Sequence, residues 1–138
     1  MFFNKKKNIT NSSVYLIKIA ALLIHAAKID EKYSYEEEEI IEQTLLDLGS
    51  TQSELETLIT KAKENQKNAN QILEYTKEIK NLEEIDKIKI IKSLWKIIYS
   101  NKVADMYETN LMRRLSGLLY IDSKTMGDIK EQIKKENS

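Results

Sequence analysis

Cysteine and proline are absent from this 138-residue sequence, and glycine occurs only three times. Without cysteine the chain has neither a disulfide nor a thiolate metal site, which suits a reducing compartment. Sheets and long loops usually need more glycine and proline in their turns, so the scarcity of both favours helices. The length is enough for one domain with its own hydrophobic core.

The sequence also lacks an excess of charge of either sign, because 22 Lys and Arg balance 22 Asp and Glu. A nucleic-acid-binding protein normally carries a basic surplus, so this class is disfavoured. The charges are unevenly placed: residues 30–56 contain ten acids and a single base, Lys32. We therefore expect an acidic pole, which is either a solvated helix face or a surface that attracts cations or a basic partner.

No run of the sequence is long and apolar enough to span a membrane. The best candidate, residues 14–27, is interrupted by Lys18 and His25 and is shorter than the roughly 20 residues required. We therefore expect a cytoplasmic protein.

His25 is the only histidine and lies on a mostly apolar helix. Such a histidine is more typical of a structural residue than of a metal ligand or a pH sensor.

The N-terminal residues 1–12 are predicted to form a flexible tail ahead of one helical domain, residues 13–138. The tail holds two aromatic and three basic residues: Phe2, Phe3, Lys5, Lys6 and Lys7. The alternative interpretation is peripheral contact with the anionic inner face of a membrane.

Residues 13–138 show the pattern of an all-α, single-domain bundle of about seven helices. Apolar residues recur at helical spacing, on faces that include Val14 in the first helix and Ile85 and Trp95 in a later one, with Trp95 as a core anchor. The later helix is apolar over more than half of its circumference, which either is buried within the monomer or supports a homodimer.

Capping signals mark several helix ends. Asn11, Ser12 or Ser13 is the expected start of the first helix, and Gly49 is the expected end of the second. Pairs that match a capping box are Ser34 with Glu37, Thr51 with Glu54, and Asp105 with Glu108; Asp122 or Ser123 caps the last helix. The polar stretch 63–70 is expected to interrupt the chain between two helices.

Two polar links, residues 29–37 and 100–108, each join two apolar helical runs. A shift of 71 residues superposes the links and the runs on either side, which predicts two helix-loop-helix units related by a weak internal repeat. The shared polar residues are Asp30, Ser34 and Glu37 in the first link and Asn101, Asp105 and Glu108 in the second.

These link residues have two interpretations. The favoured one is structural, since Ser34, Glu37, Asp105 and Glu108 are explained by capping, and Asp30 by a turn that accepts from backbone N–H groups. The other is a weak site for a hard divalent cation, Ca²⁺ or Mg²⁺, with Asp30, Glu37, Asp105 and Glu108 as oxygen ligands. Neither link matches the calcium loop of an EF-hand.

The links resemble those of the tellurite-resistance TerB-like family, especially its short stand-alone proteobacterial members. That family carries two loops of the form Asp-Gly-x-apolar-Asp/Ser-x-x-Glu after apolar helices, and the similarity covers roughly residues 14–134. This chain departs from the pattern at Glu31 and Lys102, which replace the loop glycines, and at Asn101 and Thr109 in the second loop.

The resemblance implies an all-helical fold, a cytosolic place and a role in metalloid or stress resistance. Similar domains fused to J-domain co-chaperones suggest scaffolding, with a protein partner. We expect a non-enzymatic interaction module, with cation linkage through the acidic loops. The alternatives are a regulatory or co-chaperone-type scaffold at a membrane surface and, least favoured, a metal-dependent hydrolase using Glu37 and Glu108 as a carboxylate pair.

Overall fold

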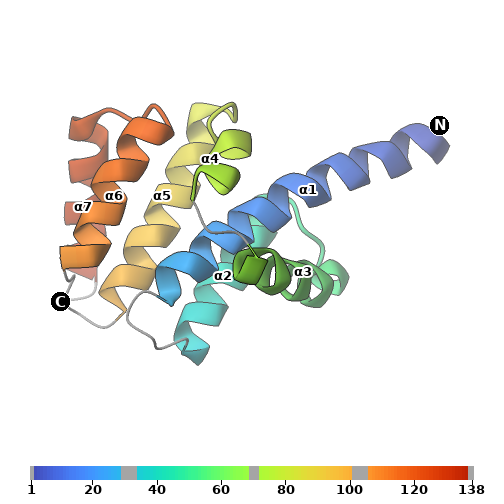
Figure 1. Cartoon of the computed structure of the whole chain (residues 1–138), viewed down its shortest axis with the longest axis horizontal. Helices are drawn as coiled ribbons and strands as arrows, with labels where there is room; N and C mark the ends of the chain where they lie inside the picture. The colour runs from blue at the N-terminus through green and yellow to red at the C-terminus, as the bar shows by residue number, and fades with distance from the viewer. Residues whose placement is uncertain (1, 29–33, 69–71, 101–105, 137–138) are drawn as a thin grey trace.

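The computed structural model describes residues 2–28, 34–68, 72–100 and 106–136, and every regular element in these ranges is helical (Figure 1). The elements are α1 (Phe2–Ala27), α2 (Tyr35–Asp47), the 3₁₀ turn η1 (Gln52–Glu54), α3 (Leu55–Asn68), α4 (Leu73–Ile79), α5 (Glu84–Tyr99), α6 (Met106–Leu118) and α7 (Ser123–Glu136). The predicted all-α bundle of about seven helices is confirmed.

The internal repeat is visible in the helix boundaries. Adding 71 to the bounds of α2, 35 and 47, gives 106 and 118, which are the bounds of α6. Adding 71 to the first residue of η1, 52, gives 123, where α7 begins. We therefore divide the fold into unit 1 (α1, α2, η1 and α3) and unit 2 (α5, α6 and α7), with α4 between them.

The two units share their internal packing and meet through their first helices. In unit 1, α1 packs against α3 and α2; in unit 2, α5 packs against α7. Helix α1 also contacts α5 and α4, and α2 contacts α5. Figure 1 shows α5, α6 and α7 side by side at one end, with α1 running diagonally away from them.

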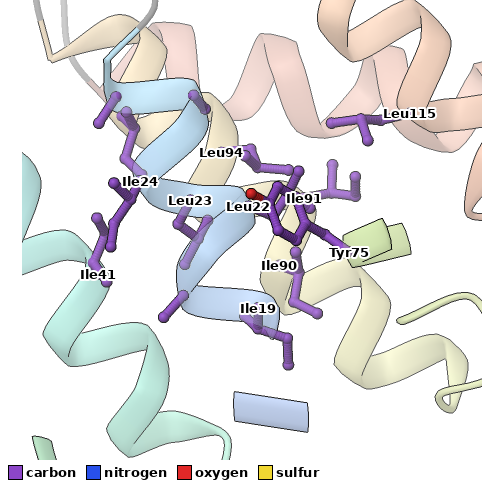
Figure 2. Close-up of a cluster of buried hydrophobic side chains, with 14 of the residues drawn as sticks. Ile19, Leu22, Leu23, Ile24, Ile41, Tyr75, Ile90, Ile91, Leu94 and Leu115 are labelled. Atoms are coloured by element: carbon purple, nitrogen blue, oxygen red, sulfur yellow. The ribbon is translucent and has the colours of Figure 1, made fainter. Parts of the chain in front are cut away.

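The core is centred on α1 and α5. Five consecutive residues of α1, 20–24, have no exposed surface, so this helix is apolar on all sides where it crosses the bundle. Side chains from five helices converge there (Figure 2): Ile19, Leu22, Leu23, Ile24, Ile41, Tyr75, Ile90, Ile91, Leu94 and Leu115. Trp95 is 2% exposed, which confirms it as a core residue. Most apolar residues of α5 are buried within the chain, whereas Ile85 is 61% exposed, and the homodimer stays a prediction.

Both units end their second helix in the same way. After α2, Gly49 adopts φ +115°, its N–H donates to the Leu46 carbonyl at 3.1 Å, and the Ser50 N–H donates to the Leu45 carbonyl at 2.9 Å. These two bonds form a Schellman motif, whose left-handed position favours glycine because it has no Cβ. The predicted helix end at Gly49 is confirmed.

In unit 2 the equivalent left-handed residue is Tyr120, with φ +58°. The Ile121 N–H donates to the Ser116 carbonyl at 2.9 Å, as in the first motif. Lys87 holds this end of the chain: its Nζ donates to the Leu119 carbonyl at 3.0 Å and lies 5.8 Å from the centroid of the Tyr120 ring. A cation at a helix C-terminus stabilises the exposed carbonyls, and the aromatic face adds a cation–π contact.

Four sequence-based predictions about helix limits and faces were wrong. Helix α1 begins at Phe2 and not near residues 11–13, and α3 continues to Asn68 through the polar stretch that was expected to break it. Neither segment contains Gly or Pro, so nothing local ends the helix. Val14 and Ile85 are 46% and 61% exposed, because α1 leaves the bundle near Val14 and Ile85 lies in the first turn of α5. The division into a tail, 1–12, and a domain, 13–138, stays a prediction.

Candidate functional site

The first link ends in a complete capping box. The Ser34 Oγ accepts from the Glu37 N–H at 3.1 Å, and the Ser34 N–H donates to Glu37 Oε1 at 2.8 Å. Glu37 is only 2% exposed, so one oxygen of a buried carboxylate is committed to a backbone amide. This geometry supports the structural role predicted for the pair, because it satisfies two of the N–H groups that a helix start leaves without partners.

Glu108, which the repeat pairs with Glu37, is equally buried at 4% exposure. A buried carboxylate therefore recurs at the same position of both units, whereas glutamates are usually exposed. The other two candidate metal ligands, Asp30 and Asp105, lie outside the residues that the structure describes. Within the described part of the chain, His, Asp and Glu do not gather in groups of three that would hold a metal ion.

The capping box predicted at Thr51 is also present in the structure. Glu54 reaches back to the Thr51 N–H at 3.2 Å and to the Thr51 hydroxyl at 2.7 Å, and these bonds lower the pKa of Glu54. At the repeat-equivalent position, Asp122 accepts from the Thr125 N–H at 2.7 Å, which lowers the pKa of Asp122. Both caps orient the third helix of their unit.

A groove runs along α2, and we call it the α2 groove. Its volume is about 540 Å³, and α2, η1, the start of α3 and α5 form its walls. Most of the charged residues described in its lining are acidic, namely Glu36, Glu39, Glu42 and Asp47, and Lys96 is basic. Apolar surface comes from Ile40, Leu46 and Leu55. Charge and apolar surface are thus combined in one depression.

Two hydroxyl groups form the junction between α2 and α5 beside this groove. The Thr44 and Ser93 hydroxyls are hydrogen-bonded to each other, and both residues also line the groove. Each hydroxyl also lies within bonding distance of the carbonyl four residues earlier, on Ile40 at 2.7 Å and on Lys89 at 3.0 Å. Because each hydroxyl has one proton, one of them donates to the other and the acceptor donates to its own helix. This pair fixes the register of α2 on α5.

One ion pair and one helix-end contact attach α2 to its neighbours. Lys63 of α3 pairs with Glu38 at 3.3 Å, and the Lys89 Nζ of α5 donates to the Asp47 carbonyl at 3.4 Å. Within α2, the hydroxyl of Tyr35 hydrogen-bonds Glu39, and this bond is the main cause of the raised pKa of Tyr35. The acids of the groove are therefore presented by a helix that is attached to both α3 and α5.

His25 lies half-buried on α1, near Arg114 of α6. Burial is the main cause of its lowered pKa, and the positive charge of Arg114 adds to the effect. Both causes favour the neutral imidazole. This environment agrees with the structural role predicted for the histidine.

The N-terminal aromatic and basic residues, Phe2 to Lys7, belong to the first turns of α1, and their side chains lie outside those that the structure describes. Figure 1 shows this part of α1 extending beyond the other helices. No described helix combines the length and apolar character needed to cross a bilayer.

The acidic pole could be predicted from the sequence, whereas the groove could not. One wall of the groove was visible in the sequence as a stripe along one helix, because helical spacing places these residues on one face: Glu36, Glu39, Ile40, Gln43 and Asp47. The missing information was that Ser93 and Lys96 of α5 close the other side.

A family model described as "Tellurite resistance protein TerB" matches residues 16–131, which is 116 of the 138 residues. A search of curated proteins and a search of solved structures each found no match to the chain.

Proposed function

Because the chain belongs to the tellurite resistance protein TerB family, we propose that it is a non-enzymatic interaction module that binds a basic, amphipathic segment of a partner protein in the α2 groove. The family description supports a role in resistance to tellurite or related stress, which this module would serve by binding and not by catalysis.

The observation that carries the proposal is the composition of the α2 groove. The described lining has four carboxylates, on Glu36, Glu39, Glu42 and Asp47, one ammonium group, on Lys96, and apolar surface beside them. Acidic walls attract a basic segment and fix its register, while apolar surface supplies most of the binding energy. A helix with lysines or arginines beside one apolar stripe has this complementary chemistry.

The test is the affinity of a fluorescent, basic amphipathic helical peptide, measured by anisotropy. Changing Glu36, Glu39 and Glu42 to Gln removes three groove charges; at roughly 0.5 kcal/mol each, this weakens binding about tenfold. The matched control changes Asp128, Glu131 and Glu136 of α7 to Asn or Gln, which alters the net charge equally on exposed positions outside the groove. The control should bind within about twofold of the unchanged protein. Equal loss in both variants would show a non-specific charge effect and contradict the proposal.

Cation linkage is the second part of the proposal. The buried carboxylates of Glu37 and Glu108 recur at equivalent positions of the two units, and oxygen ligands of this kind suit Ca²⁺ or Mg²⁺. With Asp30 and Asp105 they would make a weak site, since Glu37 already accepts from a backbone N–H.

Calorimetric titration of Ca²⁺ and Mg²⁺ into chelator-treated protein tests this link. The expected result is binding that is lost in Glu37→Gln and in Glu108→Gln but kept in Ser34→Ala, which removes a cap without removing a carboxylate. Absence of binding heat, or equal binding in all three variants, would leave the link residues with structural roles alone.

Vesicle binding distinguishes the competing membrane-surface function from partner binding in the α2 groove. Vesicles that contain anionic lipids should not retain the protein if the α2 groove is the functional surface. Retention that disappears when Lys5, Lys6 and Lys7 are changed to Gln would favour the membrane function instead.

A further inference from the structure

Unit 2 contains a second cavity, between α5, α6 and α7, with a volume of about 240 Å³. Its walls include Trp95 of α5, Met112, Arg113 and Ser116 of α6, and Lys130 of α7. Among the described residues, it shares no lining residue with the α2 groove, and neither Glu37 nor Glu108 borders it. The cavity is therefore separate from both parts of the proposed function.

Comparison with unit 1 explains why there is space here. The 71-residue offset pairs Ser116 with Leu45 and Lys130 with Ile59, and both aliphatic residues are packed into the core of unit 1 with at most 5% exposure. In unit 2 these two positions hold Ser116, which is smaller, and Lys130, which is flexible and charged. The second unit has thus exchanged part of a filled core for a hollow with polar walls.

The charged walls of this hollow are positive. Arg113 and Lys130 both border it, and the described residues around it include hydroxyls but no carboxylate. An arginine fork and an ammonium group are the usual partners of a carboxylate ligand. The apolar walls include the thioethers of Met112 and Met126, which make favourable contacts with aromatic rings.

Trp95 adds an unsatisfied donor. Its indole N–H is buried and has no hydrogen-bond partner among the described residues, which normally costs about 1–3 kcal/mol. The Tyr99 ring stacks on the indole at 5.9 Å, and the Lys130 ammonium lies 5.5 Å from the indole centroid. Those contacts engage the ring face, whereas the N–H lies at the ring edge, where the quadrupole is positive and an anionic oxygen is favoured.

We propose that this cavity, the Trp95 pocket, binds a small aryl carboxylate. The carboxylate pairs with Arg113 and Lys130, and the aromatic ring occupies the space between the methionines. The volume lies below the about 300–1,000 Å³ of pockets for drug-sized ligands, so the ligand is of single-ring size.

The sole tryptophan of the chain lines the pocket, so its emission reports binding directly. The probe is phenylacetate; its neutral amide, phenylacetamide, and inorganic phosphate are the comparison ligands. We expect a saturable change in emission with phenylacetate and at least tenfold weaker binding of both comparison ligands. No saturable change, or equal affinity for the amide or for phosphate, would overturn the proposal.

Variants locate the site. Ser116→Leu restores the residue of unit 1 and fills the pocket without changing its charge, so it should abolish the response. Arg113→Gln should weaken phenylacetate binding at least tenfold, whereas Arg114→Gln, an exposed neighbour that does not line the pocket, should leave it within twofold. If Ser116→Leu does not fold, the comparison of Arg113→Gln with Arg114→Gln alone tests the location of the site. Equal effects at Arg113 and Arg114 would place binding elsewhere and contradict the assignment.

Discussion

Tyr75 brings a hydroxyl group into the buried core. The residue is 1% exposed, its oxygen has no hydrogen-bond partner within the part of the chain that the structure describes, and burial raises the pKa of the phenol. Figure 2 shows this side chain among the aliphatic residues of α1 and α5. A polar atom left in this position lowers stability relative to an apolar atom of the same shape.

Tyr75→Phe is therefore expected to raise the free energy of unfolding by about 1 kcal/mol, because it removes the unsatisfied hydroxyl and keeps the ring. Urea denaturation measures the change. Tyr99→Phe is the control, since the hydroxyl of Tyr99 is not a buried atom without a partner. A loss of stability in Tyr75→Phe would show that the hydroxyl is satisfied in solution.

His25 makes stability depend on pH. Burial and Arg114 lower its pKa below the ordinary value of 6.5, so the unfolded chain takes up a proton more readily than the folded protein. The stabilisation is complete above pH 6.5 and is lost as pH falls through the folded pKa. Denaturation at pH 7.5 and at pH 5.5 should show a larger fall for the unchanged protein than for His25→Gln. Equal falls would assign the pH dependence to other groups.

Helix ends that depend on neighbouring side chains could be predicted from the sequence, and those that depend on packing could not. Ser34, Gly49 and Asp122 mark their helix ends because a cap is a local hydrogen-bond arrangement. Residues 11–13 also favour helix starts, yet they lie inside α1, because no Gly or Pro separates them from Phe2.

The left-handed end of α2 and the last helical turn of α6 respond oppositely to the same substitution. Gly49→Ala should destabilise the fold by about 1–2 kcal/mol, although a Cβ there has open space, because an L-residue disfavours φ +115°. Gly117→Ala should stabilise it by about 0.5–1 kcal/mol, since that glycine is helical and also has open space. Thermal unfolding of the two variants provides the test, and shifts of the same sign would contradict this explanation of the helix end.

Across the whole molecule, the repeat could be predicted in outline but its chemical differences could not. The 71-residue offset and the matching links were visible in the sequence, whereas the α2 groove depends on Ser93 and Lys96 arriving from α5. The Trp95 pocket depends on Ser116 and Lys130 standing where unit 1 has aliphatic residues. These two cavities could not be predicted from the sequence, because each depends on how helices from different parts of the chain pack together.

The contact between the units has its own test in the Thr44 and Ser93 hydroxyls. Because each is buried and bonded to the other, Thr44→Val and Ser93→Ala should each destabilise the fold by about 1 kcal/mol. The double variant should lose less than the sum of the two, with a coupling of at least about 0.5 kcal/mol. Additive losses in a double-mutant cycle would show that the two hydroxyls act independently.

The most direct measurement of the central claim is a map of backbone amide shifts during titration with a basic amphipathic helical peptide, at low and at high salt. We expect the largest changes to fall on α2, η1 and the part of α5 around Ser93 and Lys96, and we expect binding to weaken as salt rises. Changes concentrated on α6 and α7, or a salt-independent response spread over the surface, would contradict the α2 groove as the binding surface.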